Sequence, residues 1–300
     1  MSRLLSSVLP TVLPWMTVPP LRPLFHWGIR RSLRAPRLPH MRSPADFGLA
    51  FSTERIATAN GKRLHAWLIP APASAPQPAP ALIVVHGWGG NADRMLPLAP
   101  ALHAAGMTLL LLDTRCHGVS DDDTFASLPR FAEDTAHAFD WLAARPEIDP
   151  SRIALLGHSV GAGAVLLAAT WREQVAAVVS LAAFAHPADM MQRWMVERGL
   201  PDHAIGDHIL RYVQQTIGYR FDDIAPLTSL PRLRCPVLLV HGEHDTVVPV
   251  SDAQRLLAAR SHDRVHLLIG PGGHDSMDAF LTVVDEVAGF LRGVHRSAAP

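Results

Sequence analysis

The sequence is poor in cysteine, carries no excess charge of either sign, and lacks an apolar stretch that reads as a membrane-spanning helix. Its two cysteines, Cys116 and Cys235, are too few for a disulfide framework and do not have zinc-ligand spacing. Lysine plus arginine equals aspartate plus glutamate, with 27 of each, so no global charge points to a nucleic-acid partner. A long apolar run, residues 152–170, contains His158, Ser159 and three glycines near its centre, which argues against a membrane span.

Acidic residues are also missing from the N-terminal segment. None occurs before Asp46, whereas residues 1–45 hold eight prolines and seven arginines. Prolines interrupt its apolar start and no convincing cleavage site follows, so neither a signal peptide nor a spanning helix is expected. We predict that residues 1–49 form a basic, proline-rich arm without regular structure, in a cytoplasmic protein. The alternative is a peripheral membrane contact through aromatic and basic residues of the arm, namely Trp15, Trp27, Arg30, Arg31 and Arg34.

From about residue 50 onward, short apolar runs typical of buried strands alternate with segments of helical spacing. The Asn60-Gly61 pair between two strand-like segments predicts a hairpin. The strands expected after it cover residues 82–85, 107–112, 153–156, 175–181, 237–240 and 265–269, and the later helices cover 129–144, 252–259 and 276–291. Such alternation predicts an α/β fold with a mostly parallel, twisted sheet and helices on both of its faces.

One segment breaks this alternation. Residues 184–232 contain methionines, tryptophan, tyrosines and histidines but no strong strand signal. We therefore expect a core formed by residues 50–183 and 233–293, with an inserted helical cap at 184–232. Methionine and tryptophan at helical spacing in the cap predict an adaptable apolar substrate pocket, for which the candidates are Met191, Trp194 and Met195.

The motif that organises the chain is the G-x-S-x-G pentapeptide at residues 157–161. A buried strand precedes it and a helix rich in small apolar residues follows, so the motif lies in a sharp strand–turn–helix connection. This context is typical of a nucleophile elbow, which exposes the serine oxygen in a strained backbone conformation. Ser159 is therefore the predicted nucleophile, and the backbone N–H of Val160 is predicted to donate to the oxyanion.

A serine hydroxyl is a weak nucleophile unless a base takes its proton and an acid orients that base. Asp245 and His274 each follow one of the last two expected strands, at the sheet edge where parallel α/β folds gather their sites. The order serine, acid, histidine is the chain order of α/β-hydrolases. We predict that Asp245 is the acid and His274 the base, with Glu243 and Asp189 as rival acids.

The sequence resembles the α/β-hydrolase superfamily over roughly residues 50–292, and is similar to its serine-dependent esterase, lysophospholipase and S33-aminopeptidase-like members. The matching motifs are H-G-W-G-G-N at 86–91, D-T-R-C-H-G-V-S at 113–120, G-H-S-V-G at 157–161, H-G-E-H-D-T-V-V-P at 241–249 and G-G-H at 272–274. The resemblance implies an α/β-hydrolase fold and a second oxyanion donor at the backbone N–H of Trp88. Thr114 and Cys116 depart from the usual pattern, and we expect them to reshape the pocket floor.

These observations predict a serine hydrolase that cleaves carboxylic esters or thioesters of apolar acyl groups through an acyl-enzyme on Ser159. Two alternatives stay open: an S33-type aminopeptidase or amidase, and a catalytically silent binding module. Dehalogenase and epoxide-hydrolase chemistry is excluded because it needs a carboxylate where Ser159 stands. The expected partner is a small acyl substrate, with no nucleic acid. No cofactor is expected, and no metal, because His241 and His244 have no third ligand at suitable spacing.

Overall fold

The computed structural model describes residues 22–200, 204–275 and 277–297, and its centre is an eight-stranded sheet in the order β1-β2-β4-β3-β5-β6-β7-β8. β1 pairs with β2, and β2 with β4, in antiparallel fashion, while every other neighbouring pair is parallel. The strands are β1 (Ser52–Ala57), β2 (Arg63–Ile69), β3 (Ala79–Val85), β4 (Thr108–Leu112), β5 (Ile148–His158), β6 (Val178–Leu181), β7 (Val237–Gly242) and β8 (Val265–Gly270). The predicted mostly parallel sheet is confirmed.

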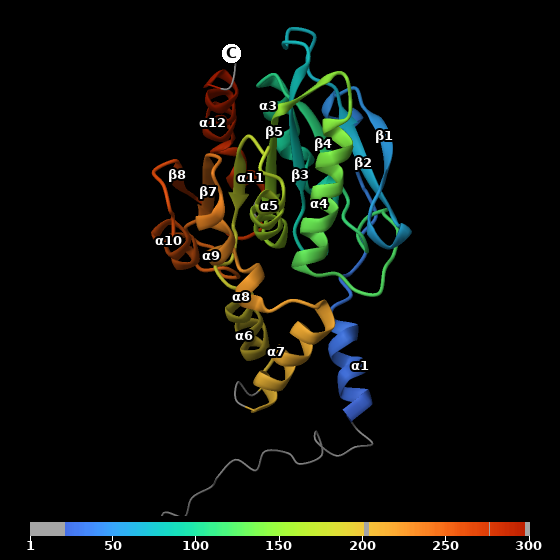
Figure 1. Cartoon of the computed structure of the whole chain (residues 1–300), viewed down its shortest axis with the longest axis vertical. Coiled ribbons are helices and arrows are strands. Elements are labelled where there is room, and N and C mark those ends of the chain that lie inside the picture. The colour runs from blue at the N-terminus through green and yellow to red at the C-terminus, as the bar shows by residue number, and fades with distance from the viewer. Residues whose placement is uncertain (1–21, 201–203, 276, 298–300) are drawn as a thin grey trace, which may run out of the picture.

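Helices connect the strands and fill both faces of the sheet (Figure 1). The α-helices are α1 (Arg22–Ser32), α2 (Ala92–Met95), α3 (Ala99–Ala104), α4 (Leu128–Ala143), α5 (Val160–Trp171), α6 (Pro187–Glu197), α7 (Ala204–Ile217), α8 (Phe221–Ile224), α9 (Pro226–Ser229), α10 (Val250–Ala258), α11 (Met277–Leu281) and α12 (Val284–Ser297). Short 3-10 turns are η2 (Pro44–Phe47), η3 (Ala59–Gly61), η4 (Leu96–Leu98) and η5 (Leu230–Arg232).

The core lies in two layers because successive strand residues point to opposite faces of the sheet. On β3, Ile83 packs in the layer that contains Phe131 of α4, whereas Leu82 packs in the layer that contains Leu102 of α3. The first layer is covered by α4, α5 and α10, and the second by α2, α3, α11 and α12. A strand buried on both faces is apolar throughout, which is why these segments lacked polar alternation in the sequence.

The parallel strands also fix where the site lies. Val85 is paired with Gly157, His158 with Leu181, and Gly242 with Gly270, so the loops after β3, β5, β7 and β8 leave the sheet at one edge. The chain between β6 and β7 forms α6, α7, α8, α9 and η5 beyond that edge. In Figure 1, α6 and α7 lie with α1 at the end of the molecule opposite to the C-terminus. We refer to α1, α6 and α7 as the distal helices.

The structure differs from the sequence-based expectations in two places. Residues 22–32 form α1, whereas the N-terminal arm was expected to lack regular structure; Trp15 and the rest of residues 1–21 lie outside the described residues. The helix expected at 276–291 is interrupted between α11 and α12. There the Thr282 hydroxyl donates to the Ala279 carbonyl at 2.6 Å. This side-chain hydrogen bond gives the backbone an alternative to the hydrogen bonds of a continuous helix. Within the described ranges, no helix has both the length and the apolar character needed to cross a bilayer.

Candidate active site

Ser159 stands at the sharp turn between β5 and α5. Its φ of 54° and ψ of −116° lie in a region that L-residues rarely adopt. The two motif glycines make this turn sterically feasible. A Cβ on Gly157 would lie 2.2 Å from the Gly161 carbonyl oxygen, and a Cβ on Gly161 would lie 2.4 Å from the His86 carbonyl oxygen. Close backbone packing therefore leaves room only for glycine at these two positions. The turn that they permit places Ser159 at the start of α5.

The structure brings the three predicted residues Ser159, His274 and Asp245 into one hydrogen-bonded chain. His274 Nε2 lies 2.8 Å from Ser159 Oγ, and His274 Nδ1 lies 2.7 Å from Asp245 Oδ2. A carboxylate only accepts, so Nδ1 carries the proton and Nε2 is free to accept from the serine hydroxyl. The side chain of the rival acid Glu243 is exposed and lies 3.5 Å from His244, whereas Asp245 is the carboxylate that contacts His274.

Asp245 is held in its ionised form by its surroundings. Its Oδ1 accepts the N–H groups of Val247 at 2.9 Å and Val248 at 2.7 Å, which leaves Oδ2 for His274. His241 Nε2 lies 3.4 Å from Oδ2 and 2.8 Å from the Val248 carbonyl oxygen. Burial raises the pKa of Asp245, but the hydrogen bonds from His241, His274 and Val248 outweigh it and hold the pKa well below its ordinary value. His241 therefore supports the carboxylate.

His158 positions the loop that carries His274. Its Nε2–H donates to the His274 carbonyl oxygen at 2.8 Å, which fixes the backbone of the base directly. Burial, with a smaller contribution from the nearby His274, lowers the pKa of His158 to about 4, so its ring is neutral at physiological pH. These contacts give His158 a structural role beside the base.

Two further histidines tie the glycine-rich loop after β3 to the loop after β4. His86 donates from Nδ1 to the Gly87 carbonyl at 2.7 Å and accepts the Thr114 N–H at Nε2. His117 accepts the Gly89 N–H at Nε2 and donates from Nδ1 to the Arg115 carbonyl. Burial lowers the pKa of His117 to about 3, so this acceptor nitrogen stays unprotonated. These bonds position the loop that contains Trp88.

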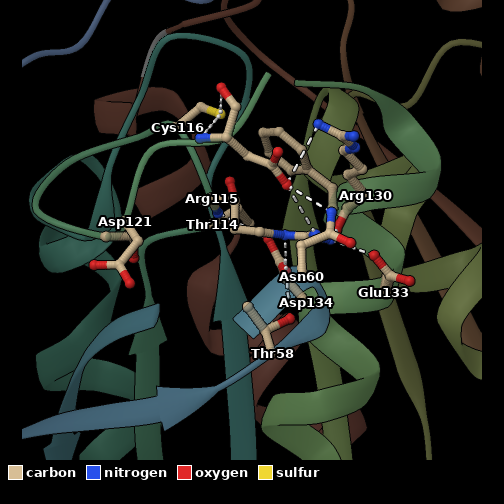
Figure 2. A network of polar contacts seen from close by, with 12 residues as sticks. Thr58, Asn60, Thr114, Arg115, Cys116, Asp121, Arg130, Glu133 and Asp134 are labelled. Atoms are coloured by element: carbon tan, nitrogen blue, oxygen red, sulfur yellow. Dashed lines mark hydrogen bonds and ion pairs between the residues drawn. The ribbon is translucent and has the colours of Figure 1, made fainter. Parts of the chain in front are cut away.

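Figure 2 shows the buried network that anchors the loop after β4. Arg115 donates from its backbone N–H and from Nε to Asp134 of α4, each at 2.7 Å, and also pairs with Glu133. Thr58 donates to the same Asp134 carboxylate. Cys116, at φ 67°, faces backbone groups of residues 123–125. Thr114 and Cys116 do not line the cavity, so the expectation that they reshape its floor is wrong.

A cavity of about 420 Å³ opens beside Ser159 and extends between the sheet edge and the distal helices. Trp88 and Val160 both line it, and Val160 is the first residue of α5, whose N–H has no partner inside the helix. Of the predicted pocket residues, Met191 and Trp194 line the cavity. Met195 does not: it is 0% exposed and packs in the core, on a direction of α6 about 100° away from Trp194.

Several cavity residues escaped sequence analysis. Ser32 and Leu33 come from the end of α1, and Val213 and Ile217 come from α7. The apolar periodicity of α7 is a signal from which its buried face could be found, but nothing in the sequence indicates that the N-terminal segment reaches the site. The charged side chains that line the cavity in the described part of the chain are Arg94 and Asp275, both exposed.

Two groups of side chains have the composition of metal ligands. His40, His65 and Asp113 have ligating atoms within 4.8 Å of one another, as do His158, His274 and Asp275. In the first group, the Asp113 oxygens already accept the N–H groups of residues 92 and 119, and His40 Nε2 lies 2.9 Å from Oδ2. In the second, His158 Nε2–H donates to a carbonyl. Hydrogen bonds therefore occupy some of the ligating atoms in each group.

The strand order, the strained serine turn and the hydrogen-bonded Ser159 define a hydrolase-type α/β architecture, and the chain has the α/β-hydrolase fold. The model of the family described as "Serine aminopeptidase, S33" matches residues 76–215. Among similar sequences, the uncharacterized protein Rv2307c of Mycobacterium tuberculosis is 27% identical over 241 residues, which cover 79% of this chain and 77% of that protein. The uncharacterized protein YfhR of Salmonella typhimurium is 29% identical over 235 residues, covering 74% of this chain and 73% of YfhR.

Solved structures of esterases share the fold. The esterase Pf2001 of Pyrococcus furiosus aligns with a TM-score of 0.71 at 20% identity, covering 87% of this chain and 97% of that chain. Est1E of Butyrivibrio proteoclasticus, solved with ferulic acid bound, aligns with a TM-score of 0.61 at 22% identity, covering 78% and 97%. At these identities the likeness concerns the fold. The chain thus has the α/β-hydrolase fold, and its structural neighbours include esterases.

Proposed function

We propose that this protein is a serine hydrolase that cleaves carboxylic esters or thioesters of apolar acyl groups. The observation that carries the proposal is the hydrogen-bonded chain from Ser159 through His274 to Asp245, which opens directly into a cavity of about 420 Å³. Nucleophile, base and orienting acid are within hydrogen-bond distance of one another, as nucleophilic catalysis by serine requires.

In the proposed reaction, Ser159 Oγ attacks the acyl carbonyl carbon while His274 Nε2 accepts the hydroxyl proton. Asp245 stabilises the imidazolium that forms and keeps Nδ1 protonated, so the other nitrogen faces the serine. The protonated His274 then donates to the leaving alcohol or thiol, which produces an acyl-enzyme on Ser159. Water, deprotonated by His274, releases the acid and restores the serine.

The oxyanion of each tetrahedral intermediate needs donors that are already in place. We assign this role to the backbone N–H groups of Trp88 and Val160, both on the cavity wall beside Ser159. The loop of Trp88 is held in position by His117 through the Gly89 N–H at 3.1 Å. A lost donor of this kind typically costs about 3 kcal/mol of activation free energy.

We further propose that residues 184–232 act as the cap that selects the acyl group, over the core formed by 50–183 and 233–293. α6 and α7 contribute Met191, Trp194, Val213 and Ile217 to the cavity wall, and these side chains offer an apolar surface to an acyl chain. Each additional buried methylene is worth about 0.8 kcal/mol, so medium-length acyl groups should be preferred to acetyl.

The second candidate function is an S33-type aminopeptidase, which would need an acidic group to bind the substrate amine. Asp275 favours it, because this exposed carboxylate follows the base and lines the cavity. The cap acids give it no support: Asp189 is paired with Arg255 at 2.7 Å, and Asp222 lies 3.1 Å from His186. Asp202 lies outside the described residues.

A matched pair of substrate panels separates the two candidates. The purified protein should hydrolyse p-nitrophenyl esters with a rate that rises from acetate to medium chain length, and it should be slow on aminoacyl p-nitroanilides. Ser159→Ala should lose the ester activity and keep the fold. If anilides are the better substrates and Asp275→Asn raises KM for them specifically, the aminopeptidase assignment replaces the esterase assignment. Turnover of neither panel by a folded protein would favour a binding module.

A further inference from the structure

α1 has two chemically different faces. Phe25, His26, Ile29 and Leu33 turn toward the rest of the molecule, and Ile29 is buried. At 3.6 residues per turn, Leu24, Arg30 and Arg31 all point within roughly 60° of the direction of Trp27. Leu24 is 63% exposed and Trp27 is 60% exposed. We refer to Leu24, Trp27, Arg30, Arg31 and Arg34 as the basic face of α1.

The inner face attaches α1 firmly to α7. The ring of His26 stacks on Tyr212 with centroids 3.8 Å apart, and His26 Nε2 lies 3.0 Å from His208 Nε2. Phe25 also contacts the His208 ring, with centroids 5.8 Å apart. In Figure 1, α1 lies at the outside of the molecule, and the residues of its basic face are all exposed.

The arginines of the basic face have no anionic partner within the described ranges. No ion pair of Arg30, Arg31 or Arg34 occurs there, and no acidic residue precedes Asp46 in the sequence. The local field is positive: besides burial and His208, the charges of Arg22 and Arg30 lower the pKa of His26. On α7 the nearby charged residues are Asp207 and Arg211, which together add no net charge.

The same helix leads to the cavity. Ser32 and Leu33, at the end of α1, form part of its wall together with Val213 and Ile217 of α7. α1 therefore presents exposed apolar and basic side chains on one face and a cavity-lining side chain at its end. A group held against the basic face therefore lies on the helix whose end, with α7, forms part of the cavity wall.

We propose that the basic face of α1 binds the surface of a bilayer that contains anionic phospholipids, and that acyl substrates enter the cavity from this surface. The entry of substrate rests on the proposed function, whereas the binding does not. Arginines pair with lipid phosphates and carboxylates, while Trp27 and Leu24 insert at the headgroup level. A soluble polyanion would leave Trp27 and Leu24 exposed to water. A second copy of the chain would bring like charges together.

The test is flotation of the full chain with vesicles of phosphatidylcholine alone or with about one third phosphatidylserine. We expect binding to the anionic vesicles, weak binding to the neutral ones, and loss of binding as salt rises. The variant Arg30→Gln/Arg31→Gln/Arg34→Gln should bind roughly a hundredfold more weakly, since each surface arginine contributes about fivefold. Trp27→Ala should also weaken binding. The matched control, Arg232→Gln/Arg260→Gln/Arg292→Gln, removes three exposed arginines elsewhere and should bind as the wild type does.

Further measurements distinguish this proposal from the proposed function. Ser159→Ala should float with anionic vesicles as the wild type does, because Ser159 is remote from the basic face. The triple variant of α1 should keep wild-type turnover of a soluble short ester and lose turnover of an ester embedded in anionic vesicles. The proposal is overturned if both arginine triple variants bind equally, if neutral vesicles bind as tightly, or if Trp27→Ala dissociates a dimer in size-exclusion chromatography without changing flotation.

Discussion

Two regions form the wall of the cavity: the sheet edge that carries Ser159, and the distal helices. Different interactions hold each of them in place. At the edge, backbone atoms determine the arrangement: Gly161 has no room for a Cβ, and Ser159 is held in a strained conformation. The distal helices are held by apolar side chains and rings, such as His26 on Tyr212. Changes at the edge should therefore have large effects on chemistry or folding, whereas changes in the distal helices should have small, graded effects on substrate preference.

The largest effect is expected at Asp245. In Asp245→Asn the amide oxygen can still accept the Val247 and Val248 N–H groups, so its NH₂ group must face His274. His274 Nδ1 then becomes an acceptor, and the wrong tautomer directs an N–H at Ser159. A loss of about 10⁴ in kcat is known for this change in the serine-protease case.

Glu243→Gln is the matched control, because it removes a neighbouring carboxylate that faces solvent. Steady-state ester hydrolysis should show near wild-type kcat for Glu243→Gln and a severe loss for Asp245→Asn. The reverse ranking would show that the acid has been assigned to the wrong residue.

The next largest effect concerns folding at the serine turn. Gly161→Ala places a Cβ 2.4 Å from the His86 carbonyl oxygen and 2.6 Å from that of Val85, where backbone must move. We expect a loss of about 3 kcal/mol or more in the free energy of unfolding. Gly28→Ala, in α1, meets nothing within 4 Å and should stabilise by up to about 1 kcal/mol.

Urea denaturation of both glycine variants measures this difference. Equal, small effects of the two substitutions would mean that the edge is no more constrained than the distal helices, contrary to the comparison above.

Acid should destabilise the fold through three buried histidines. Burial lowers the pKa of His117 to about 3 and the pKa values of His158 and His295 to about 4, whereas an unfolded histidine has an ordinary value of about 6.5. Between these values the unfolded chain binds protons that the folded chain does not, so stability falls as the pH falls. At about pH 5 each histidine should cost about 2 kcal/mol.

His295 isolates one of these contributions. Neither of its ring nitrogens has a hydrogen-bond partner among the described residues, and it lies in α12, away from the cavity. His295→Leu should therefore raise stability and remove about one third of the loss that the three histidines cause between about pH 7.5 and pH 5, without changing ester turnover. An unchanged pH dependence of unfolding in this variant would contradict the assignment.

The smallest effect is expected in the distal helices. Trp194→Ala and Leu33→Ala each remove part of the apolar cavity wall, and we expect the preference for longer acyl chains to weaken by up to about fourfold per methylene. Turnover of acetate esters should hardly change. Met195→Ala is the control, since it should lower stability by about 2–5 kcal/mol and leave the chain-length profile intact. If Met195→Ala alone flattened the chain-length profile, Met195 would be the residue that contacts the acyl chain, and Trp194 and Leu33 would not.

This comparison also explains what could be predicted from the sequence. The strands, the serine turn and the order Ser159, Asp245, His274 were predictable because strand ends place short motifs at one edge regardless of distant contacts. The meeting of these three side chains follows the prediction, and their catalytic roles stay a proposal. The distal helices were less predictable. Helical spacing could not determine which of Trp194 and Met195 faces the cavity, and the docking of α1 depends on partners more than 180 residues away.

The most direct test of the central claim is covalent labelling of the folded protein by a fluorophosphonate. The account predicts that one phosphonyl group is added per chain, and that peptide mapping by mass spectrometry locates it on Ser159. Ser159→Ala should remain unlabelled, and Asp245→Asn should react far more slowly because its base is misoriented. Labelling of Ser159→Ala at the wild-type rate, or no labelling of the folded wild type, would contradict the claim that Ser159 is an activated nucleophile.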